Sequence, residues 1–498
     1  MLLEKNVRLA HSILWRLQQQ AYEQFGPAAW SQQGVPSYLT SNPLTAKYYA
    51  HIALAYLRDN ADALEWNEPF YCFDLGAGTG KFAYLFLKEF LPLLSCTPFG
   101  NKLSFRYIMT DIAEKNRSFW SSHPLLSCYF SQGILERCAY CHGDTSSVLY
   151  LENSGRYLDL SMQTNPYILI ANYFFDTIPQ DFFRIVKGAL YEGLVTVATE
   201  GNKAEKKPDP LCIPSLKLSW DYRLLMPEEV ERYYSNESCQ QMLKNYLMAT
   251  FEEGLFLFPS AAFCSLDFFH RCSGGQFLLL AGDQAVVTQE QVRAAGEPYL
   301  SLHGSFSLPV NYHALAAYCQ MKGGQSFLTS LPDPIFATIA AAFGRKNVVF
   351  PETQMAFKAH LDAFQIKDYW ILVEEGRRHC SPSLDEIFLW IKLGNWDPTN
   401  VYTFFSAIKG AIASARPEQR AALLLMIERV YSNFFLVENS DAVFILNLGV
   451  LCFELRHYQR ALFYFEEAQK YLGEEELLLK GNIAACYRAL KMHTELAE

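Results

Sequence analysis

The chain has 498 residues, of which 50% are hydrophobic and 19% are charged, and its formal net charge is −10 at pH 7. That length suffices for two or three domains, and that composition excludes a disordered chain. The negative charge argues against a general nucleic-acid-binding protein, and no apolar run reaches the length that a membrane span needs.

Residues 1–65 are expected to form an N-terminal helical segment with a break at 34–37. Residues 1–20 read as an amphipathic helix, because charged side chains interrupt the apolar positions that a signal peptide would keep together. The thirteen cysteines are odd in number and scattered, which favours free thiols in a reducing compartment. We therefore expect a cytoplasmic protein.

Residues 71–85 have the pattern of a buried strand, a glycine-rich turn and the start of a helix. Gly76, Gly78 and Gly80 stand at every second position, where they let the backbone approach a ligand closely. The free N–H groups at the start of the helix would face the same ligand. An ordinary tight bend is the alternative.

The spacing of this turn separates three kinds of nucleotide site. A P-loop is excluded, because Phe82 follows Lys81 where the motif needs Ser or Thr. A dinucleotide fingerprint counted from Gly78 reaches Ala83, so that interpretation is weakened but stays open. The closest match runs from Asp74 to Gly80 and resembles motif I of class I S-adenosylmethionine (SAM) methyltransferases. The resemblance implies that the glycines pack against the methionine end of SAM.

Acidic residues end the next two predicted strands. Asp111 follows the strand at 103–111, where a ribose-binding carboxylate of that family would stand; the alternative is a helix N-cap. Asp144 closes a third predicted strand and is a candidate acceptor from the adenine amino group, or a plain turn residue. Residues 138–142 match the c-type haem attachment pattern, but nothing signals export, so we predict no haem or metal site.

Residues 165–172 form a continuous apolar run that reads as a buried parallel strand. In a doubly wound sheet, ligands bind at the carboxyl ends of the strands. The loop that begins at Asn172 and ends at Pro179 should therefore face the methyl donor and the acceptor. Residues 181–198 read as an antiparallel pair that turns at Lys187 and Gly188, and residues 201–210 as a solvent loop.

Several further segments, taken together, resemble the MidA-type SAM-dependent methyltransferases, which include a mitochondrial complex I assembly factor. Besides motif I, the matching residues are, in family order, 38–41 before it and 171–172, 176–179, 190–192, 275–283, 303–305 and 310–315 after it. The resemblance implies a class I methyltransferase core with added helices, and some members methylate arginine on a partner protein. Asp176 is the candidate acceptor-orienting acid, or else a residue that only shapes the loop. Where the family usually has Glu after Asn172 this chain has Tyr173, which leaves arginine specificity and catalysis itself open.

Residues 340–498 carry helical periods whose spacing resembles tetratricopeptide repeats. The clearest unit contains Gly449, Cys452, Ala461 and Phe465, and a second copy begins near Asn482. Such an array either caps the preceding domain or presents a concave surface to a protein partner.

The sequence thus predicts an α/β fold: a class I SAM methyltransferase (Rossmann-like) sheet with helical insertions at 66–330, followed by an all-α repeat domain at 340–498. The predicted activity is SAM-dependent methylation of a side chain on a protein recruited by the repeats, with no nucleic acid, membrane or metal involved. The alternatives are a catalytically inactive SAM-binding scaffold and a small-molecule methyltransferase. The predicted cofactor-binding residues are Asp74, Gly76, Gly78, Gly80, Asp111, Asp144 and Asn172, and the predicted catalytic residue is Asp176.

Overall fold

The computed structural model describes residues 1–100, 102–200, 210–250, 253–330, 336–345, 348–378, 382–473 and 477–495. All but the last residue of the solvent loop predicted at 201–210 lies outside these ranges. The chain divides into two compact units. The first comprises Met1–Ser41 and Tyr48–Phe364, and the second comprises Asn42–Lys47 and Gln365–Glu498.

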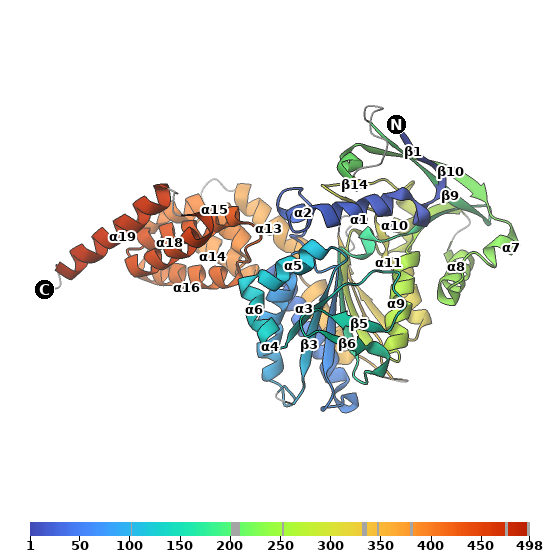
Figure 1. The fold of residues 1–498 in the computed structure, drawn as a ribbon, viewed down its shortest axis with the longest axis horizontal. Coiled ribbons are helices and arrows are strands. Elements are labelled where there is room, and N and C mark those ends of the chain that lie inside the picture. The colour runs from blue at the N-terminus through green and yellow to red at the C-terminus, as the bar shows by residue number, and fades with distance from the viewer. Residues whose placement is uncertain are drawn as a thin grey trace. The chain divides into compact units, whose positions relative to one another are not determined.

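A seven-stranded sheet forms the centre of the first unit (Figure 1). Its strands, in chain order, are β2 (Phe70–Leu75), β3 (Phe105–Thr110), β4 (Leu135–Cys138), β7 (Tyr167–Asn172), β12 (Phe277–Asp283), β17 (Gln325–Leu328) and β18 (Ala337–Ala342). Their spatial order is β17-β18-β12-β7-β2-β3-β4. The five strands from β12 to β4 are parallel, and β18 is antiparallel to both of its neighbours.

The strand order reverses beside β2. From β2 the chain moves outward on one side to β3 and β4, and it then returns to the other side of β2 with β7 and β12. In an open parallel sheet, such a reversal leaves a crevice outside the carboxyl ends of the strands. Here the crevice lies between the loops that follow β2 and β7.

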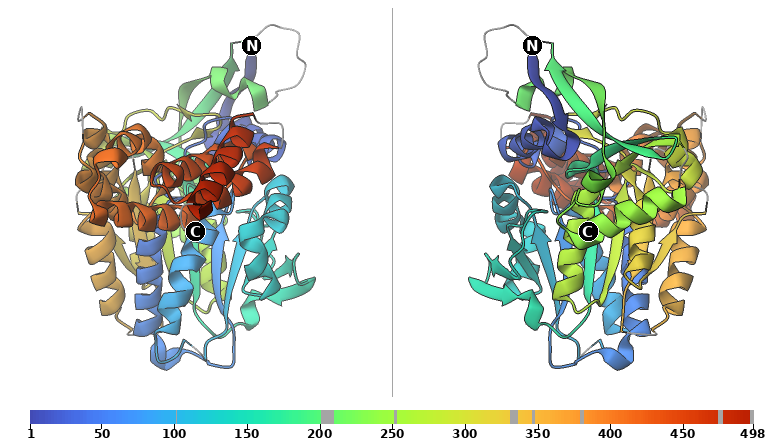
Figure 2. Two further views of the ribbon diagram at one scale, coloured as in Figure 1. Left: turned by 90° about the vertical axis from the view of Figure 1, so that its left-hand side faces the viewer. Right: turned by 90° about the vertical axis from the view of Figure 1, so that its right-hand side faces the viewer.

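Helices cover both faces of this sheet (Figure 2). On one face, Phe86 of α4 (Lys81–Ser95) packs against Tyr107 of β3, with ring centroids 5.6 Å apart. On the other face, Phe269 of α9 (Ser260–Cys272) lies 5.6 Å from Phe73 of β2. Side chains alternate across a strand, so the apolar residues of the parallel strands are buried on both sides.

A second, antiparallel sheet uses the first residues of the chain. It contains β1 (Leu2–Arg8), β8 (Asp181–Val186), β9 (Ala189–Thr199), β10 (Leu216–Leu224) and β11 (Glu253–Phe258). The antiparallel pair predicted at 181–198 is confirmed, and Lys187 and Gly188 both take positive φ in its turn. The helix predicted for residues 1–20 is wrong at its start: β1 pairs with β9, and α1 (Ile13–Phe25) begins only after it. A pairing between residues so far apart in sequence leaves no local signal.

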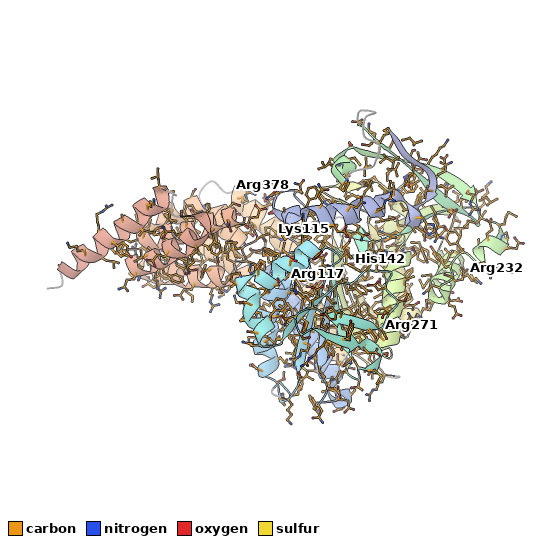
Figure 3. The ribbon with its side chains drawn as sticks, in the orientation of Figure 1. Lys115, Arg117, His142, Arg232, Arg271 and Arg378 are labelled. Atoms are coloured by element: carbon orange, nitrogen blue, oxygen red, sulfur yellow. The ribbon has the colours of Figure 1, made fainter. Side chains whose placement is uncertain are left out.

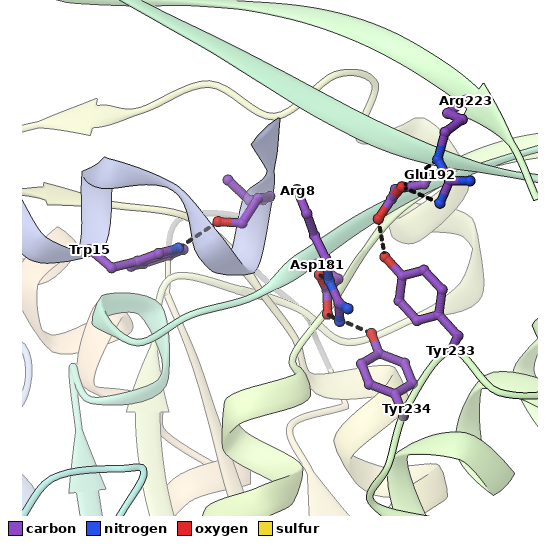
Figure 4. A network of polar contacts seen from close by, with 8 residues as sticks. Arg8, Trp15, Asp181, Glu192, Arg223, Tyr233 and Tyr234 are labelled. Atoms are coloured by element: carbon purple, nitrogen blue, oxygen red, sulfur yellow. Dashed lines mark hydrogen bonds and ion pairs between the residues drawn. The ribbon is translucent and has the colours of Figure 1, made fainter. Parts of the chain in front are cut away.

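Arg8 fixes the end of β1 through a buried acid (Figure 4). Its guanidinium donates to both carboxylate oxygens of Asp181, at 2.6 and 2.7 Å, and lies 4.2 Å from the ring centroid of Tyr233. The hydroxyl of Tyr234 donates to the same carboxylate at 2.6 Å. Bidentate pairs of this kind fix orientation as well as position. The Trp15 indole N–H donates to the Leu9 carbonyl at 2.7 Å, so the start of α1 is fixed along with β1.

The remaining helices and strands of the first unit are shorter or peripheral. The helices are α2 (Ala28–Ser31), α5 (Glu114–Ser122), α6 (Pro124–Ser131), α7 (Pro227–Val230), α8 (Glu237–Thr250), α10 (Gln289–Ala294), α11 (Tyr312–Met321) and α12 (Pro351–Phe357), and α3 (Pro43–Asp59) begins in the second unit. The strands are β5 (Val148–Leu151), β6 (Arg156–Asp159), β13 (Ala285–Val286), β14 (Ser301–Leu302), β15 (Phe306–Ser307) and β16 (Val310–Asn311).

The predicted end of the first domain, at 330, is too early. β18 lies beyond it and is an interior strand of the large sheet, paired with β12 and β17. Its sequence, Ala-Thr-Ile-Ala-Ala-Ala, contains mostly alanine, which is depleted in strands, so the pattern did not read as one. The strand forms because all six of its residues are buried in the sheet.

The second unit is helical throughout its described part. Its helices are α13 (Ile366–Arg378), α14 (Leu384–Leu393), α15 (Pro398–Ala411), α16 (Pro417–Asn433), α17 (Val443–Glu454), α18 (Tyr458–Leu472) and α19 (Leu477–Glu495). A Cβ at Gly449 of α17 would lie 2.6 Å from the Phe465 ring of α18, so a glycine is what lets these two helices approach. This is the small-against-large contact that the sequence pattern predicted at these positions.

Candidate functional site

The glycine turn after β2 has the backbone that its sequence predicts. Gly76, Gly78 and Gly80 all have positive φ, at 69°, 57° and 78°. A Cβ at Gly76 would lie 3.2 Å from the Phe174 ring, and one at Gly78 would lie 2.8 Å from the Trp30 ring. Both the backbone angles and the close neighbours therefore require glycine at these two positions.

Gly80 has a different role from the other two glycines. Its neighbours are Trp120 of α5 and Leu126 of α6, 3.0 and 3.3 Å from a Cβ placed there, and Gly80 is not among the residues that line the cavity described below. The Trp120 indole N–H also donates to the Gly78 carbonyl at 2.9 Å. Gly80 thus lets helices pack behind the turn and does not share the cavity wall with the other two glycines.

A cavity of about 510 Å³ opens at the carboxyl ends of the parallel strands. It is lined by residues from 10–41, 74–82, 111–112, 140–142 and 172–179. We call the wall made by Asp74, residues 76–79 and Asp111 the turn side. We call the wall made by residues 10–41 together with the loop 173–179 the cover side.

Asp111 lines the turn side and connects the two strand ends. Its carboxylate accepts from the Gly78 N–H at 3.2 Å, from the Ala113 N–H at 2.8 Å and from the Asn116 side-chain amide at 3.0 Å. Burial raises the pKa of Asp111, and these three donors oppose that rise. The bond from the Ala113 N–H is the contact that Asp111 would make as a helix N-cap. Asp111 makes this bond and also lines the cavity.

Asp74 is the second acid of the turn side. The hydroxyl of Tyr107 donates to its carboxylate at 2.9 Å. Burial, with a smaller contribution from the charge of Asp111, raises the pKa of Asp74 to about 7. The acid that precedes the glycines is therefore much harder to ionise than an exposed aspartate.

Asn172 and Tyr173 occupy the boundary between the two sides, at the end of β7. The Asn172 side-chain oxygen accepts from the Tyr49 hydroxyl at 2.9 Å, while its buried amide nitrogen has no hydrogen-bond partner among the described residues. Tyr173 has φ of 49°, in the left-handed region, and its N–H donates to the Gly282 carbonyl at 2.8 Å. Left-handed backbone at a bulky residue costs about 1–3 kcal/mol and is found most often at functional sites.

Asp176, the predicted catalytic acid, does not line the cavity. It is buried in a short 3₁₀ turn (Phe175–Thr177), where its N–H donates to the Asp283 carboxylate at 3.3 Å and its carbonyl accepts from the Leu308 N–H at 3.2 Å. Burial, and then the adjacent charge of Asp283, raise the pKa of Asp176 well above its ordinary value. The prediction is corrected: the loop does face the cavity, but its acid points into the protein, toward a second carboxyl group.

Asp144 also lies away from the cavity, on the surface. Its carboxylate accepts from the Cys141 N–H at 2.8 Å, which closes a turn beyond β4. The plain-turn interpretation is correct, and the adenine role is not supported. Tyr140, Cys141 and His142, from the same segment, line the cavity instead, and burial lowers the pKa of His142. His142 is labelled in Figure 3.

The sequence did not predict that the cover side lines the cavity. Side chains of η1 (Leu9–His11), α1 and the following segment line the cavity, among them His11, Trp15, Arg16 and Trp30. The segment is held from far along the chain: the Tyr22 hydroxyl lies 3.0 Å from the Ser305 hydroxyl, and a Cβ at Gly304 would meet the Gln33 backbone. Gly304 and Ser305 belong to one of the family-like segments, so that segment was the available signal.

The described ranges contain no cluster of three or more His, Cys, Asp or Glu side chains placed to hold a metal ion. Among their helices, none has both the length and the apolar character to cross a membrane. Their cysteines form no disulfide, and Cys264 is exposed, with its sulfur 3.8 Å from that of the buried Cys239.

Comparisons with known proteins give only distant likenesses. No protein-family model and no curated protein sequence matches the chain. Among solved structures, an uncharacterized COG1565 superfamily protein from Burkholderia thailandensis is similar over 68% of this chain and 88% of its own, at 12% identity and a TM-score of 0.40. A second COG1565 superfamily member from that organism, a proposed methyl transferase bound to S-adenosyl-homocysteine, is similar over 69% and 89%, at 11% identity and a TM-score of 0.41. Likenesses this weak say nothing about individual site residues.

Proposed function

We propose that the cavity binds SAM and that the protein is a SAM-dependent methyltransferase of the class I, Rossmann-like type. The observation that carries this proposal is the turn side itself. A left-handed glycine turn after the first strand and an acid after the second, tied by the bond from the Gly78 N–H to Asp111, line one cavity at the strand-order reversal. Cofactors bind at that point in doubly wound sheets.

The described residues fit the chemical groups of SAM. The glycine turn offers the methionine end a backbone surface without side chains, and a Cβ at Gly76 or Gly78 would press against the ring of Phe174 or Trp30 on the cover side. Asp111 has one carboxylate lone pair left for a ribose hydroxyl, after its three protein donors. The unpartnered amide nitrogen of Asn172 points to a further acceptor from bound ligand.

The chemistry that SAM supplies is a methyl group on a positively charged sulfur. The protein then contributes mainly position: it must hold the acceptor atom in line with the carbon–sulfur bond and exclude water. The cover side, with the rings of Trp15, Tyr22 and Trp30, provides an apolar wall for that purpose.

We also propose that the second unit is a tetratricopeptide-like array that recruits a protein carrying the acceptor, in the cytoplasm. Its support is the helical hairpin α17–α18, in which Gly449 meets Phe465 as the repeat pattern requires. Stacked helical hairpins present extended surfaces suited to protein partners.

A binding and transfer experiment separates the enzyme from its alternative. Calorimetric titration of SAM is followed by incubation with labelled SAM and an extract of the source organism. Saturable binding with a labelled product supports the enzyme. Binding without any labelled product favours an inactive SAM-binding scaffold, which the strained Tyr173 in place of a carboxylate would then explain. Absence of binding contradicts the proposed function outright.

A further inference from the structure

The charges around the cavity are divided between its two sides. Among the described residues that line it, the only two carboxyl groups are Asp74 and Asp111, and both belong to the turn side. Both are already engaged with protein donors, Asp111 by three and Asp74 by Tyr107. Neither lies on the side where a methyl acceptor would enter.

The cover side contains cationic and neutral groups instead. Arg16 lines it from α1, is exposed, and has no carboxylate within ion-pair distance in the described part of the chain. His11 and His142 are the other titratable bases of the lining. The acid of the loop, Asp176, is buried against Asp283 and does not line the cavity, and Tyr173 lines the cavity without a carboxylate.

This arrangement suits an anion and not a cation. A guanidinium or ammonium acceptor needs a carboxylate to orient it, and it must lose a proton to a base in order to become a nucleophile. A carboxylate acceptor is already charged and nucleophilic. It would pair with the Arg16 guanidinium through two N–H donors, which is the geometry that arginine favours.

We infer that the methyl acceptor is a carboxylate, which Arg16 holds against the SAM methyl group, so that the product is a methyl ester. This inference rests on the proposed function. In the step, a carboxylate oxygen forms a bond to the methyl carbon, the carbon–sulfur bond breaks, and its electron pair stays on sulfur as S-adenosyl-homocysteine leaves. The negative carboxylate and the positive sulfonium give two uncharged groups at the reacting atoms, and no proton is transferred.

The absence of a free acid on the cover side then has a chemical reason. Methylation of nitrogen would require one of the two histidines as base, because Asp176 lies behind the wall. Transfer to a carboxylate oxygen requires no base at all. The acceptor carboxylate can come from an acidic side chain or chain end of a protein, or from a small organic acid, and both share the chemistry that Arg16 recognises.

The test uses the full chain and the alkali lability of methyl esters. The protein is incubated with SAM labelled in its methyl group and with the protein fraction, or separately the low-mass fraction, of an extract of the source organism. Mild alkali should release the label as methanol, and the fraction that carries the label identifies the source of the carboxylate. A product that keeps its label in alkali is not a methyl ester, and it overturns the inference while leaving the proposed function intact.

A binding measurement tests Arg16 without relying on transfer. The probes are an acetyl-Gly-Glu-Gly-amide peptide and benzoate, each titrated into the protein saturated with S-adenosyl-homocysteine. The substitution Arg16→Gln removes a charge-assisted pair, so it should lower the affinity for whichever probe binds by about tenfold or more. Arg16→Lys should lower that affinity less, because lysine keeps the charge. Arg271→Gln is the matched control, because Arg271 is an exposed arginine at the end of α9 that does not line the cavity (Figure 3).

The outcomes of the two measurements are separable. Failure of S-adenosyl-homocysteine to bind contradicts the proposed function. If it binds but neither probe binds, or Arg16→Gln behaves like Arg271→Gln, the assignment of Arg16 is wrong. If S-adenosyl-homocysteine binds and no fraction is labelled, both the transfer and its acceptor are refuted.

Discussion

The two sides of the cavity differ in how the chain builds them. The turn side comes from residues 74–79 and Asp111, which stand next to consecutive strands of one sheet and bond to each other. The cover side comes from the first 41 residues and is fixed by partners such as Ser305, 283 residues beyond Tyr22. The first is a local motif with acids already engaged, and the second is a long-range assembly without a free acid. This difference fits the proposal that the turn side binds the cofactor and the cover side selects the acceptor.

The largest effect is expected from a substitution in the turn side. Gly78→Ala places a Cβ 2.8 Å from the Trp30 ring at a φ of 57°, so it should weaken SAM binding by at least tenfold, as measured by calorimetry. Gly133→Ala is the matched control: its φ is 65°, but nothing lies within 4 Å of the new Cβ. Both variants should lose about 1–2 kcal/mol of folding stability to the left-handed backbone, Gly78→Ala more because of the Trp30 contact, and only Gly78→Ala should lose affinity. Equal affinities would remove the turn from the binding site.

A second prediction compares two acids that the sequence pattern could not distinguish. Asp111→Asn should weaken SAM binding by about tenfold to a hundredfold, because it removes a charged acceptor for the ribose. Asp144→Asn should leave the affinity within about twofold, because Asp144 only closes a surface turn. The same titration measures both variants. A loss of SAM affinity in Asp144→Asn but not in Asp111→Asn would mean that Asp144, and not Asp111, binds the cofactor.

A third prediction sharpens the contrast by adding an acid to the cover side. Tyr173→Glu introduces the carboxylate that the resembled family usually has, facing the same cavity as Arg16. The negative charge of this glutamate should repel the carboxylate probe and weaken its binding by about tenfold. The affinity for SAM should stay within about threefold. Tyr173→Gln is the control, because glutamine has the size of glutamate without its charge, and it should weaken binding of the probe less. If both variants weaken the probe equally, shape and not charge selects the acceptor.

The smallest expected effect concerns the acid pair behind the cover side. Burial raises the pKa of Asp283 to about 7, against about 3.9 in an unfolded chain. The folded protein therefore binds more protons than the unfolded one, so this contribution to stability is full below about pH 4 and is lost as the pH rises through 7. Asp283→Asn should make the unfolding free energy less steep in pH between 5 and 7, by at most about 1.4 kcal/mol per pH unit. An unchanged slope in chemical denaturation would show that Asp283 is already ionised.

The sequence predicted those parts of the site that depend on neighbouring residues. Gly76, Gly78, Asp111 and Asn172 line the cavity, and each has a local signature in the sequence, because a glycine, acid or amide stands at the end of a predicted strand. Asp176 was assigned to the right loop, but its direction depends on Asp283, 107 residues away. Side-chain direction within an irregular loop follows from tertiary packing and not from pattern.

The missed elements of the fold have the same cause. β1 pairs with β9 nearly 190 residues later, and β18 is an alanine-rich strand that forms only because strands flank it on both sides. Neither carries a periodicity that distinguishes it from helix. The cover side depends on β1 through Arg8 and Asp181, so missing the strand also meant missing the cavity wall that Arg16 lines.

The most direct test is a crystal structure of the full chain with S-adenosyl-homocysteine. The ribose hydroxyl should lie within about 2.5–3.2 Å of the Asp111 carboxylate, with the methionine end over residues 76–79 and the sulfur directed toward the cover side. Density for the ligand at any other place, or a cavity without ligand at saturating concentration, would contradict the assignment of the turn side to SAM.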